Sequence, residues 1–432
     1  MKNSQKQAFS PAGLIQSVYK VFSKIAEPKR TANSAIPLID HLMSGLAIFG
    51  LKFPSLLQYD LQRYDTPIRA NLKNLYHVNT PPSDTYLREC LDEVNPTLLR
   101  PVFKKLFAEL QDSKCLEQFQ FLDGHYILAI DGTGEFSSSK VSCEHCCKKE
   151  HKNGTVTYYH QMLGACIVHP DFSQVIPLCP EHIQNEDGNL KNDCERNATK
   201  RFIENFRREH PHLKVIVTED GLASNGPNLK LLEANNMKYF IGAKPGDHEY
   251  LFQQLATSDE VEYYEYQDDK GVFHQFDFVN GLSLNKSHID LKVNMIDYME
   301  TQPNGKMLRF SWVTNIPINK DNVYQLMRGG RARWKIENET FNTLKTLGYN
   351  FEHNYGHGKK YLASVFSLLM VLAFFIDQIQ AITCECFKIA RKAQRIYRAL
   401  WEAMRVFFTH FIIESWDQFY QLLGKQPRLD TS

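Results

Sequence analysis

Residues 119–132, FQFLDGHYILAIDG, mark the point where the chain changes from helical to strand-like texture. They contain two runs rich in β-branched and aromatic residues, joined by Asp123 and Gly124, a dipeptide typical of tight hairpin turns. Further strands are predicted in TVTYYHQMLGACIVH (155–169) and QVIPLC (174–179). Such apolar runs are expected to lie in a sheet.

The sequence that follows alternates helical and strand-like runs. A long helix is predicted over residues 192–210. A continuous apolar strand, LKVIVTED (213–220), a helix around NLKLLEAN (228–235) and a strand, KYFIGAK (238–244), complete the series. Strands joined first by hairpins and then by helices predict a mixed sheet with helices packed on it.

The rest of the chain divides into two helical regions and one β-rich region. Residues 1–115 have the pattern of several short helices broken by turn signals. Residues 245–321 alternate strand-like runs with Gly and Asn turns, which predicts a β-rich insertion. Residues 359–432 are again helical. The predicted core that carries the mixed sheet therefore consists of residues 116–244 and 322–358.

Composition indicates a folded protein without a strong overall charge. The chain of 432 residues is 43% hydrophobic, which allows a large core, and its net charge is +1. Any nucleic-acid surface would therefore be a local patch. Ten cysteines lack the regular spacing of a disulfide framework, and no signal peptide opens the sequence, so a reducing cytoplasm is expected.

The longest apolar run, residues 362–376, stops at Asp377. It is shorter than the roughly 20 residues that a membrane span needs. A buried core helix is predicted here, and no membrane association is expected.

Two acidic residues end predicted strands. Asp131 closes HYILAID and Asp220 closes VIVTED, and strand ends converge on the rim of a sheet, where open mixed sheets place their sites. Each acid also precedes a glycine, Gly132 or Gly221. Taken alone, each is therefore explained equally well as a turn residue.

A third acidic candidate lies in RARWKIENETFNTLK (331–345). At about 100° per residue, a helix here places Arg333 and Glu337 in the same stripe as Phe341, with Glu339 roughly opposite. A carboxylate in an apolar stripe is costly unless a cation or a hydrogen-bond donor meets it. Glu337 is therefore the predicted functional glutamate, and Glu339 is the alternative.

Three stretches of the chain resemble the acidic motifs of bacterial insertion-sequence transposases: IDGTGEFSS, then EDGLASN with the later KYFIGAKPG, then RWKIENETFNTLKTLGYNFEHNYGHG. These are DDE transposases with a ribonuclease-H-like core, in the subgroup that inserts a β-rich domain before the catalytic Glu. The resemblance covers residues 119–358. It implies an α+β or mixed α/β fold, in which a ribonuclease-H-like mixed sheet with flanking helices is interrupted by the β-rich insertion. An N-terminal helical bundle that binds DNA ends and C-terminal helices complete the expected fold.

The resemblance also implies that Asp131, Asp220 and Glu337 are catalytic and bind two Mg²⁺ or Mn²⁺ ions. Phosphodiester cleavage and strand transfer are in-line displacements, which two divalent ions about 3.5–4 Å apart catalyse by holding the attacking and leaving oxygens. Such hard ions prefer carboxylate oxygens to thiolates.

The family pattern around the Glu is Tyr, two residues, Arg, three residues, Glu, six residues, Lys. Arg333 and Glu337 match it, whereas Gly330 occupies the Tyr position and Lys345 lies one residue late. These departures leave the role of Lys345 open and keep Glu339 as a second choice. Arg333 is expected to meet phosphate oxygens or to brace the carboxylate, and the alternative is a simple salt bridge with Glu337.

Other basic residues are candidates for DNA contacts. Lys244 ends the last predicted core strand, although a solvated loop lysine has the same pattern. A basic stripe at helical spacing is predicted to lie opposite Ile389, Ile396, Tyr397 and Leu400, and it consists of Lys388, Arg391, Lys392, Arg395 and Arg398. It would follow a DNA backbone or form a solvated face.

The cluster CEHCCKKEH offers Cys143, Cys146 and His151 at metal-like spacing, and His160 would complete a four-ligand zinc site across the following turn. The alternative is that these residues are idle in a reduced loop. A zinc ion here would staple the first hairpin beside Asp131 and would not be the catalytic ion.

The sequence therefore predicts a DNA transposase of an insertion sequence that acts on terminal inverted repeats and target DNA. The family implies a homodimer in the synaptic complex and a bacterial, cytoplasmic location, with the protein on the nucleoid when bound to DNA. One alternative is a non-catalytic or domesticated DNA-binding protein derived from a transposase. Another is a metal-dependent hydrolase of a small substrate, which would have a closed pocket.

Overall fold

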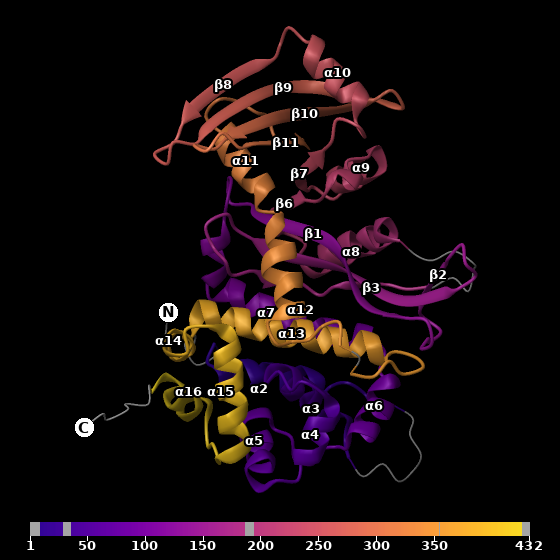
Figure 1. Cartoon of the computed structure of the whole chain (residues 1–432), viewed down its shortest axis with the longest axis vertical. Coiled ribbons are helices and arrows are strands. Elements are labelled where there is room, and N and C mark those ends of the chain that lie inside the picture. The colour runs from indigo at the N-terminus through magenta and orange to yellow at the C-terminus, as the bar shows by residue number, and fades with distance from the viewer. Residues whose placement is uncertain (1–8, 29–35, 186–193, 354, 426–432) are drawn as a thin grey trace.

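The computed structural model describes residues 9–28, 36–185, 194–353 and 355–425. Its centre is one long mixed sheet with the strand order β2-β3-β1-β6-β7-β11-β10-β9-β8 (Figure 1). The strands are β1 (Tyr126–Ser138), β2 (Cys147–Glu150), β3 (Val156–Val168), β4 (Ile176–Pro177), β5 (Glu181–Ile183), β6 (Val215–Thr218), β7 (Lys238–Ala243), β8 (Glu262–Gln267), β9 (Phe273–Asn285), β10 (His288–Thr301) and β11 (Met307–Thr314).

The first half of this sheet has the ribonuclease-H-like arrangement that the sequence predicts. Strand β3 is antiparallel to β1, whereas β6 lies parallel to β1 on its other side and β7 lies parallel to β6. The short strands β4 and β5 pair with β3. Helix α8 (Glu195–Glu209) precedes β6, and α9 (Gly226–Ala234) connects β6 to β7. The predicted mixed α/β class is therefore confirmed.

The hairpin predicted at Asp123 and Gly124 is only partly present. Both residues have positive φ, 49° and 73°, as a two-residue hairpin turn of type I′ requires. The run before the turn is not a strand, however, because residues Cys115–Phe119 form a 3₁₀ helix and only an isolated bridge joins Gln120 to Tyr126. Both edges of β1 are already occupied by β3 and β6, so no edge remains for another strand.

The β-rich segment continues the sheet instead of standing apart from it. Strand β11 pairs antiparallel with β7, from Ser311 opposite Ala243 to Thr314 opposite Phe240. Strands β8 to β11 then follow as antiparallel neighbours, with α10 (Glu249–Thr257) packed on β9. The rigid extension of the core sheet by β11 was not predicted from the sequence.

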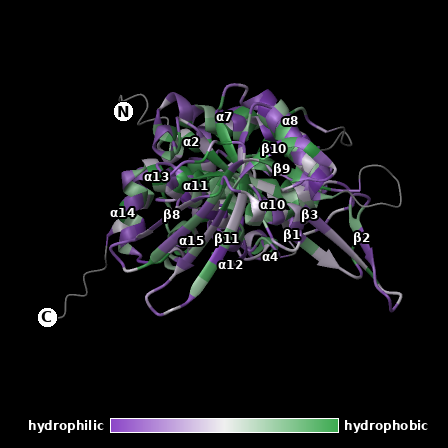
Figure 2. Cartoon of the chain, turned by 90° about the horizontal axis from the view of Figure 1, so that it is seen from above, coloured by the Kyte–Doolittle hydropathy of each residue, from purple (hydrophilic) through white to green (hydrophobic). Residues whose placement is uncertain are grey.

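The helices of both chain ends form one layer below the sheet (Figure 1). They are α2 (Pro11–Phe22), α3 (Leu38–Gly50), α4 (Leu56–Gln62), α5 (Thr66–Tyr76), α6 (Asp84–Asp92), α7 (Arg100–Asp112), α13 (Leu362–Thr383), α14 (Glu385–Ala393), α15 (Tyr397–His410) and α16 (Trp416–Gly424). In Figure 2, apolar residues gather in the middle of the molecule and hydrophilic ones on outer helices such as α8. Whether residues 1–115 bind DNA ends stays a prediction, as does the division into domains.

Helix α13 is the centre of this helical layer. By length and composition it is the one helix in the described residues that would cross a membrane, but 89% of its most apolar window is buried inside the protein. It contacts α3, α6, β4 and α14. This is the environment of a core helix.

Candidate functional site

Asp131 and Asp220 each lie two residues beyond the point where the parallel pairing of β1 with β6 ends. Ala129 of β1 pairs with Thr218 of β6, so the same register, continued by two residues, brings Asp131 next to Asp220. Neighbouring strands are about 4.8 Å apart, and residues at matching register point to the same face. The carboxylate of Asp131 accepts a hydrogen bond from the Gly132 amide (2.9 Å), and that of Asp220 accepts one from the Leu222 amide (3.0 Å).

The segment that carries Glu337 is not the single regular helix predicted over residues 331–345. Helix α11 (Val323–Arg331) ends in a tightened turn, residues Ile336–Phe341 form a π-helix, and α12 (Asn342–Thr346) follows. The turn begins where α11 presses on the sheet: a Cβ at Gly330 would lie 2.4 Å from the Phe240 ring and 2.7 Å from Trp312. A tyrosine side chain at this position would meet both rings. Single-turn π-helices are frequent at functional sites.

Arg333 joins the strand acid to the helix acid. Its Nη1 donates to Asp131 Oδ2 (3.0 Å) and to Glu337 Oε1 (2.8 Å). The Arg333 side chain is only 13% exposed, whereas the Glu337 side chain is 36% exposed and so remains open to solvent. The charge of Glu337 acts on Asp131, whereas that of Glu339 adds to the rise that burial causes in the pKa of Tyr397, on α15.

A glycine lets the Glu337 segment approach the strand acid. Gly164 of β3 is the register partner of Asp131. A Cβ at Gly164 would lie 2.6 Å from Cε1 and 2.8 Å from Cζ of Phe341, at the end of the π-helix. The absence of a side chain at Gly164 therefore sets the distance between Glu337 and the sheet.

Substituting Gly164 with alanine is expected to lower the free energy of unfolding by about 1–3 kcal/mol, the usual cost of overpacking. Adding Phe341→Leu should recover part of this loss, because it removes the ring that the new methyl group meets. The control is Gly134→Ala on the neighbouring strand β1, where a Cβ meets nothing within 4 Å. Urea denaturation measures all of these variants, and equal losses at Gly164 and Gly134 would contradict the steric account.

Two more carboxylates belong to this site. Glu195, the first residue of α8, lies against Gly132, where a Cβ would come 2.2 Å from its Oε1. Burial raises the pKa of Glu195, and the charge of Asp220 adds to the rise. Glu219 is buried, accepts a hydrogen bond from Asn228 Nδ2 (2.8 Å) and has its pKa raised by burial to about 7. The sequence context of Glu195, on the helix predicted over residues 192–210, fits a surface residue as well as a support for the site. Sequence analysis misses Glu219, although a glutamate in the apolar run LKVIVTED is a signal.

The electrostatics of the site suit a divalent cation. The pKa of Asp131 is raised to about 6. Burial is the main cause and the negative charge of Glu337 adds to the rise, whereas the positive charge of Arg333 lowers the pKa. Several carboxylates thus converge with one guanidinium between two of them. The carboxylates outnumber the guanidinium, and carboxylate oxygens are hard ligands of the kind that Mg²⁺ and Mn²⁺ prefer. In the described residues, the carboxylate oxygens of Asp131, Asp220 and Glu337 do not all lie within 4.8 Å of one another, as the ligand atoms of the cysteine and histidine cluster described below do.

The predicted DNA-contacting lysines have separate surroundings. Lys244 is exposed after β7, and its side chain passes over Gly221, where a Cβ would lie 3.5 Å from Lys244 Cγ and Cε, so it lies beside Asp220. Lys345 instead forms an ion pair with Glu352 (2.8 Å).

The predicted basic stripe is wrong as a continuous feature. Helix α14 ends at Ala393, and Arg395 adopts a positive φ of 62° in the turn before α15. Lys388 pairs with Glu385 (2.8 Å), and the Arg391 guanidinium lies 4.3 Å from the Tyr397 ring centroid. Ile389 and Ile396, expected on a buried face, are exposed. The reason is the chain reversal at residues 394–396, which helical periodicity alone does not reveal.

The predicted zinc ligands are correct in part. Cys143, Cys146 and His160 converge with His357, and their ligand atoms lie within 4.8 Å of one another, which makes a possible Cys₂His₂ metal site. His151 does not belong to it, because its Nε2 contacts Thr157 Oγ1 (2.8 Å) on the exposed end of the hairpin. His357, more than 200 residues from the CxxC pair, replaces it.

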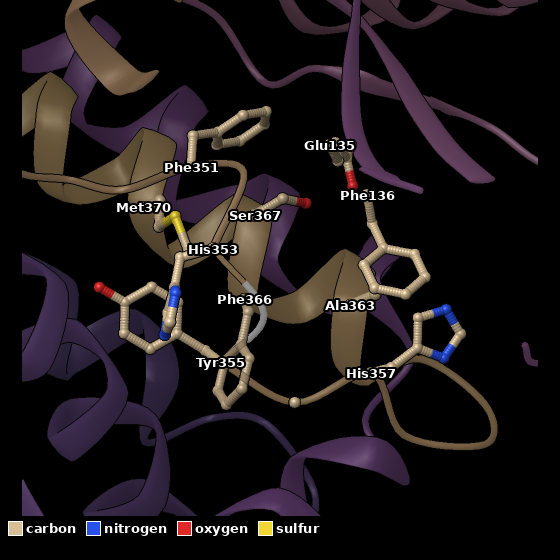
Figure 3. Close-up of a pocket in the computed structure, with 11 residues that line it drawn as sticks. Glu135, Phe136, Phe351, His353, Tyr355, His357, Ala363, Phe366, Ser367 and Met370 are labelled. Atoms are coloured by element: carbon tan, nitrogen blue, oxygen red, sulfur yellow. The ribbon is translucent and has the colours of Figure 1, made fainter. Parts of the chain in front are cut away.

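A small cavity adjoins this cluster (Figure 3). It has a volume of about 30 Å³ and lies between Glu135 and Phe136 of β1 and residues 351–370. Space of that size holds a water molecule, not a substrate. A larger cavity of about 530 Å³ lies near His210 and Lys214. Neither cavity is lined by the three candidate catalytic acids, as a pocket for a small substrate would be.

Comparison with known proteins gives distant structural likenesses. No protein-family model and no curated protein matches the sequence. The structure is similar to that of the piggyBac transposase in a synaptic complex with hairpin DNA, with a TM-score of 0.41 and 12% sequence identity over 99% of this chain and 82% of that chain.

Proposed function

We propose that this chain is a DDE-type DNA transposase that cuts the ends of an insertion sequence and joins them to target DNA. The observation that carries the proposal is the arrangement of three carboxylates. Asp131 and Asp220 each lie two residues beyond the last β1–β6 pair of a ribonuclease-H-like sheet, and Arg333 bonds both Asp131 and Glu337. The acids come from distant parts of the chain, and turn formation does not account for the link between Asp131 and Glu337.

Each side chain has a proposed role. Asp131, Asp220 and Glu337 would hold two Mg²⁺ or Mn²⁺ ions, which would stabilise the attacking and leaving oxygens of an in-line displacement at phosphorus. Arg333 positions Glu337 and Asp131 before DNA binds, and its guanidinium suits a phosphate oxygen as well. Lys244, which lies beside Asp220, would contact the DNA backbone.

The substrate is double-stranded DNA, first the terminal inverted repeats of the element and then the target. In this proposal the chain acts in bacterial cytoplasm, on the nucleoid, and a homodimer holds both element ends in one synaptic complex. The acids lie outside both cavities described above, which suits a polymer substrate laid over the sheet edge better than a small molecule.

The test uses the DNA that flanks the gene. Labelled fragments carrying the flanking inverted repeats are incubated with the purified chain, with and without Mg²⁺, and cut strands are measured beside gel-shift binding. We expect nicking at the repeat boundary only with Mg²⁺ or Mn²⁺, and none with Asp131→Asn. Specific binding without cutting would overturn the proposal and support a non-catalytic DNA-binding protein, in which Arg333 simply neutralises Asp131 and Glu337.

A further inference from the structure

The cysteine and histidine cluster has the dimensions of a tetrahedral metal site. The two sulfur atoms of Cys143 and Cys146 are 3.8 Å apart, and the Nε2 atoms of His160 and His357 are 3.1 Å apart. His160 Nε2 lies 3.3 Å from Cys143 Sγ and 3.4 Å from Cys146 Sγ, and His357 Nε2 lies 3.3 Å from Cys146 Sγ.

These distances between the sulfur and nitrogen atoms agree with those expected around a bound zinc ion. Zn–S bonds of about 2.3 Å and Zn–N bonds of about 2.0–2.1 Å at tetrahedral angles separate two sulfurs by about 3.8 Å, a sulfur and a nitrogen by about 3.6 Å, and two nitrogens by about 3.3 Å. A disulfide does not explain them, since it needs sulfurs about 2.05 Å apart.

Hydrogen bonds alone do not explain the cluster either. His160 Nε2 has three close neighbours, Cys143 Sγ, Cys146 Sγ and His357 Nε2. An imidazole nitrogen either donates one hydrogen or accepts with one lone pair, so it satisfies one of these contacts at a time. A cation at the centre satisfies all four ligand atoms together.

The surroundings of the cluster favour one tautomer of His357 and favour zinc as the metal. His357 Nδ1 lies 3.2 Å from the Gly358 carbonyl oxygen, so that donation from Nδ1 leaves the Nε2 lone pair directed at the cluster. The Cys143 amide donates to Cys146 Sγ (3.4 Å), as thiolate sulfur favours. Two thiolates with two imidazoles in tetrahedral arrangement are typical of zinc and unlike any Mg²⁺ site. All four positions are filled by protein, which leaves no open coordination site for catalysis.

The position of the cluster indicates what such a metal would do. Phe136 is the register partner of His160, and Asp131 is that of Gly164, so the cluster lies five residues along β1 from the acid, or about 16 Å at about 3.3 Å per residue. His357 belongs to the segment between α12 and α13, and its ring packs on Phe136 with centroids 4.5 Å apart (Figure 3). The cluster therefore links the β1–β3 hairpin to the chain that follows Glu337.

We propose that Cys143, Cys146, His160 and His357 bind one structural Zn²⁺ that fastens the segment following the Glu337 helix to the β1–β3 hairpin. Zinc binding itself is independent of the proposed transposase function, whereas the positioning of Glu337 for catalysis rests on it. The ion is distinct from the catalytic ions at Asp131.

Metal content and metal spectroscopy test the binding. The full chain, purified under reducing conditions without chelator, is expected to contain one zinc per chain by elemental analysis, and Co²⁺ exchange should give tetrahedral d–d bands with thiolate charge transfer. His357→Ala and Cys146→Ser should each lose the stoichiometric metal. The matched control, His151→Ala, removes a histidine from the same hairpin and should keep it. Absence of zinc with no Co²⁺ uptake, or loss of metal in His151→Ala but not in His357→Ala, would overturn the assignment.

Hydrogen exchange tests the fastening without any DNA. Removing zinc from the wild-type chain with a chelator should increase amide exchange in residues 336–346 and 351–358, while α9 at the opposite side of the sheet keeps its protection. This result would stand even if the chain cut no DNA. Equal exchange in both regions with and without zinc would show that the ion does not position the Glu337 segment.

Discussion

Glu337→Ala is expected to lower Mg²⁺-dependent cutting of the element end by about a thousandfold or more, since loss of a carboxylate that holds the catalytic ions removes several kcal/mol of transition-state stabilisation. Glu337 shares Arg333 with Asp131, and its side chain is open to solvent on the side where DNA would lie. Single-turnover nicking of the labelled repeat end measures the effect.

The matched control is Glu339→Ala, the same substitution two residues along the same π-helix. Because Glu337, and not Glu339, shares Arg333 with Asp131, the Glu339→Ala variant should cut within a few-fold of the wild-type rate. Gel-shift binding of the end should be similar in both variants, since neither residue is basic. If Glu339→Ala abolished cutting and Glu337→Ala did not, the assignment of the third carboxylate would be wrong.

Periodicity predicted part of the Glu337 segment. It places Phe341 in an apolar stripe, and Phe341 is buried together with Ile336 and Leu344 of the same segment. It does not predict the tightened turn after α11 or the π-helix at Ile336–Phe341, and the turn follows the position where Gly330 lets α11 pack on Phe240 and Trp312. Phe240 and Trp312 come close to each other only when β7 and β11 pair, so the sequence around Gly330 does not reveal this contact.

The same distinction separates the cysteines and histidines that converge in the cluster from the histidine that does not. Cys143 and Cys146 are neighbours in the chain, and His160 follows across one hairpin, so spacing was sufficient to find them. Spacing also predicts His151, which is close in sequence, and does not point to His357. The fold decides otherwise: the hairpin carries His151 outward to its exposed end, and the return of the chain after α12 brings His357 to the cluster.

Charged residues inside the protein were the least predictable. Lys52 lies in a loop with a turn-like sequence, where a solvated lysine is the ordinary expectation. Its side chain is fully buried, pairs with Asp377 of α13 and lies 3.7 Å from the Trp401 ring centroid. Tyr349, shortly after α12, donates to the same Asp377 carboxylate (2.5 Å). This group links α3, α13 and α15 to the end of the Glu337 segment.

Lys52→Met is expected to lower the free energy of unfolding by about 3–5 kcal/mol, because breaking a buried ion pair leaves an uncompensated charge. Burial already raises the pKa of Asp377, and Lys52 and the Tyr349 hydroxyl oppose that rise, so loss of Lys52 leaves the tyrosine alone to meet the carboxylate. Urea denaturation at neutral pH measures the loss. The control is Lys388→Met, which breaks the exposed pair with Glu385 and should cost within about 0.5 kcal/mol.

The double variant Lys52→Met, Asp377→Leu separates two free energies: the cost of burying Asp377 without a partner, and the stabilisation that the ion pair itself provides. It removes both charges and fills the space with apolar groups, so most of the stability lost in Lys52→Met should return, apart from about 1 kcal/mol for the Tyr349 hydroxyl left without its acceptor. A double variant as unstable as Lys52→Met would mean that the pair itself stabilises the fold.

Lys52→Met should also increase amide exchange in residues 336–346, since Tyr349 holds the end of that segment on α13. If exchange there stayed unchanged while global stability fell, the buried pair would support the helical layer alone and leave the position of Glu337 to Arg333 and the Cys₂His₂ cluster.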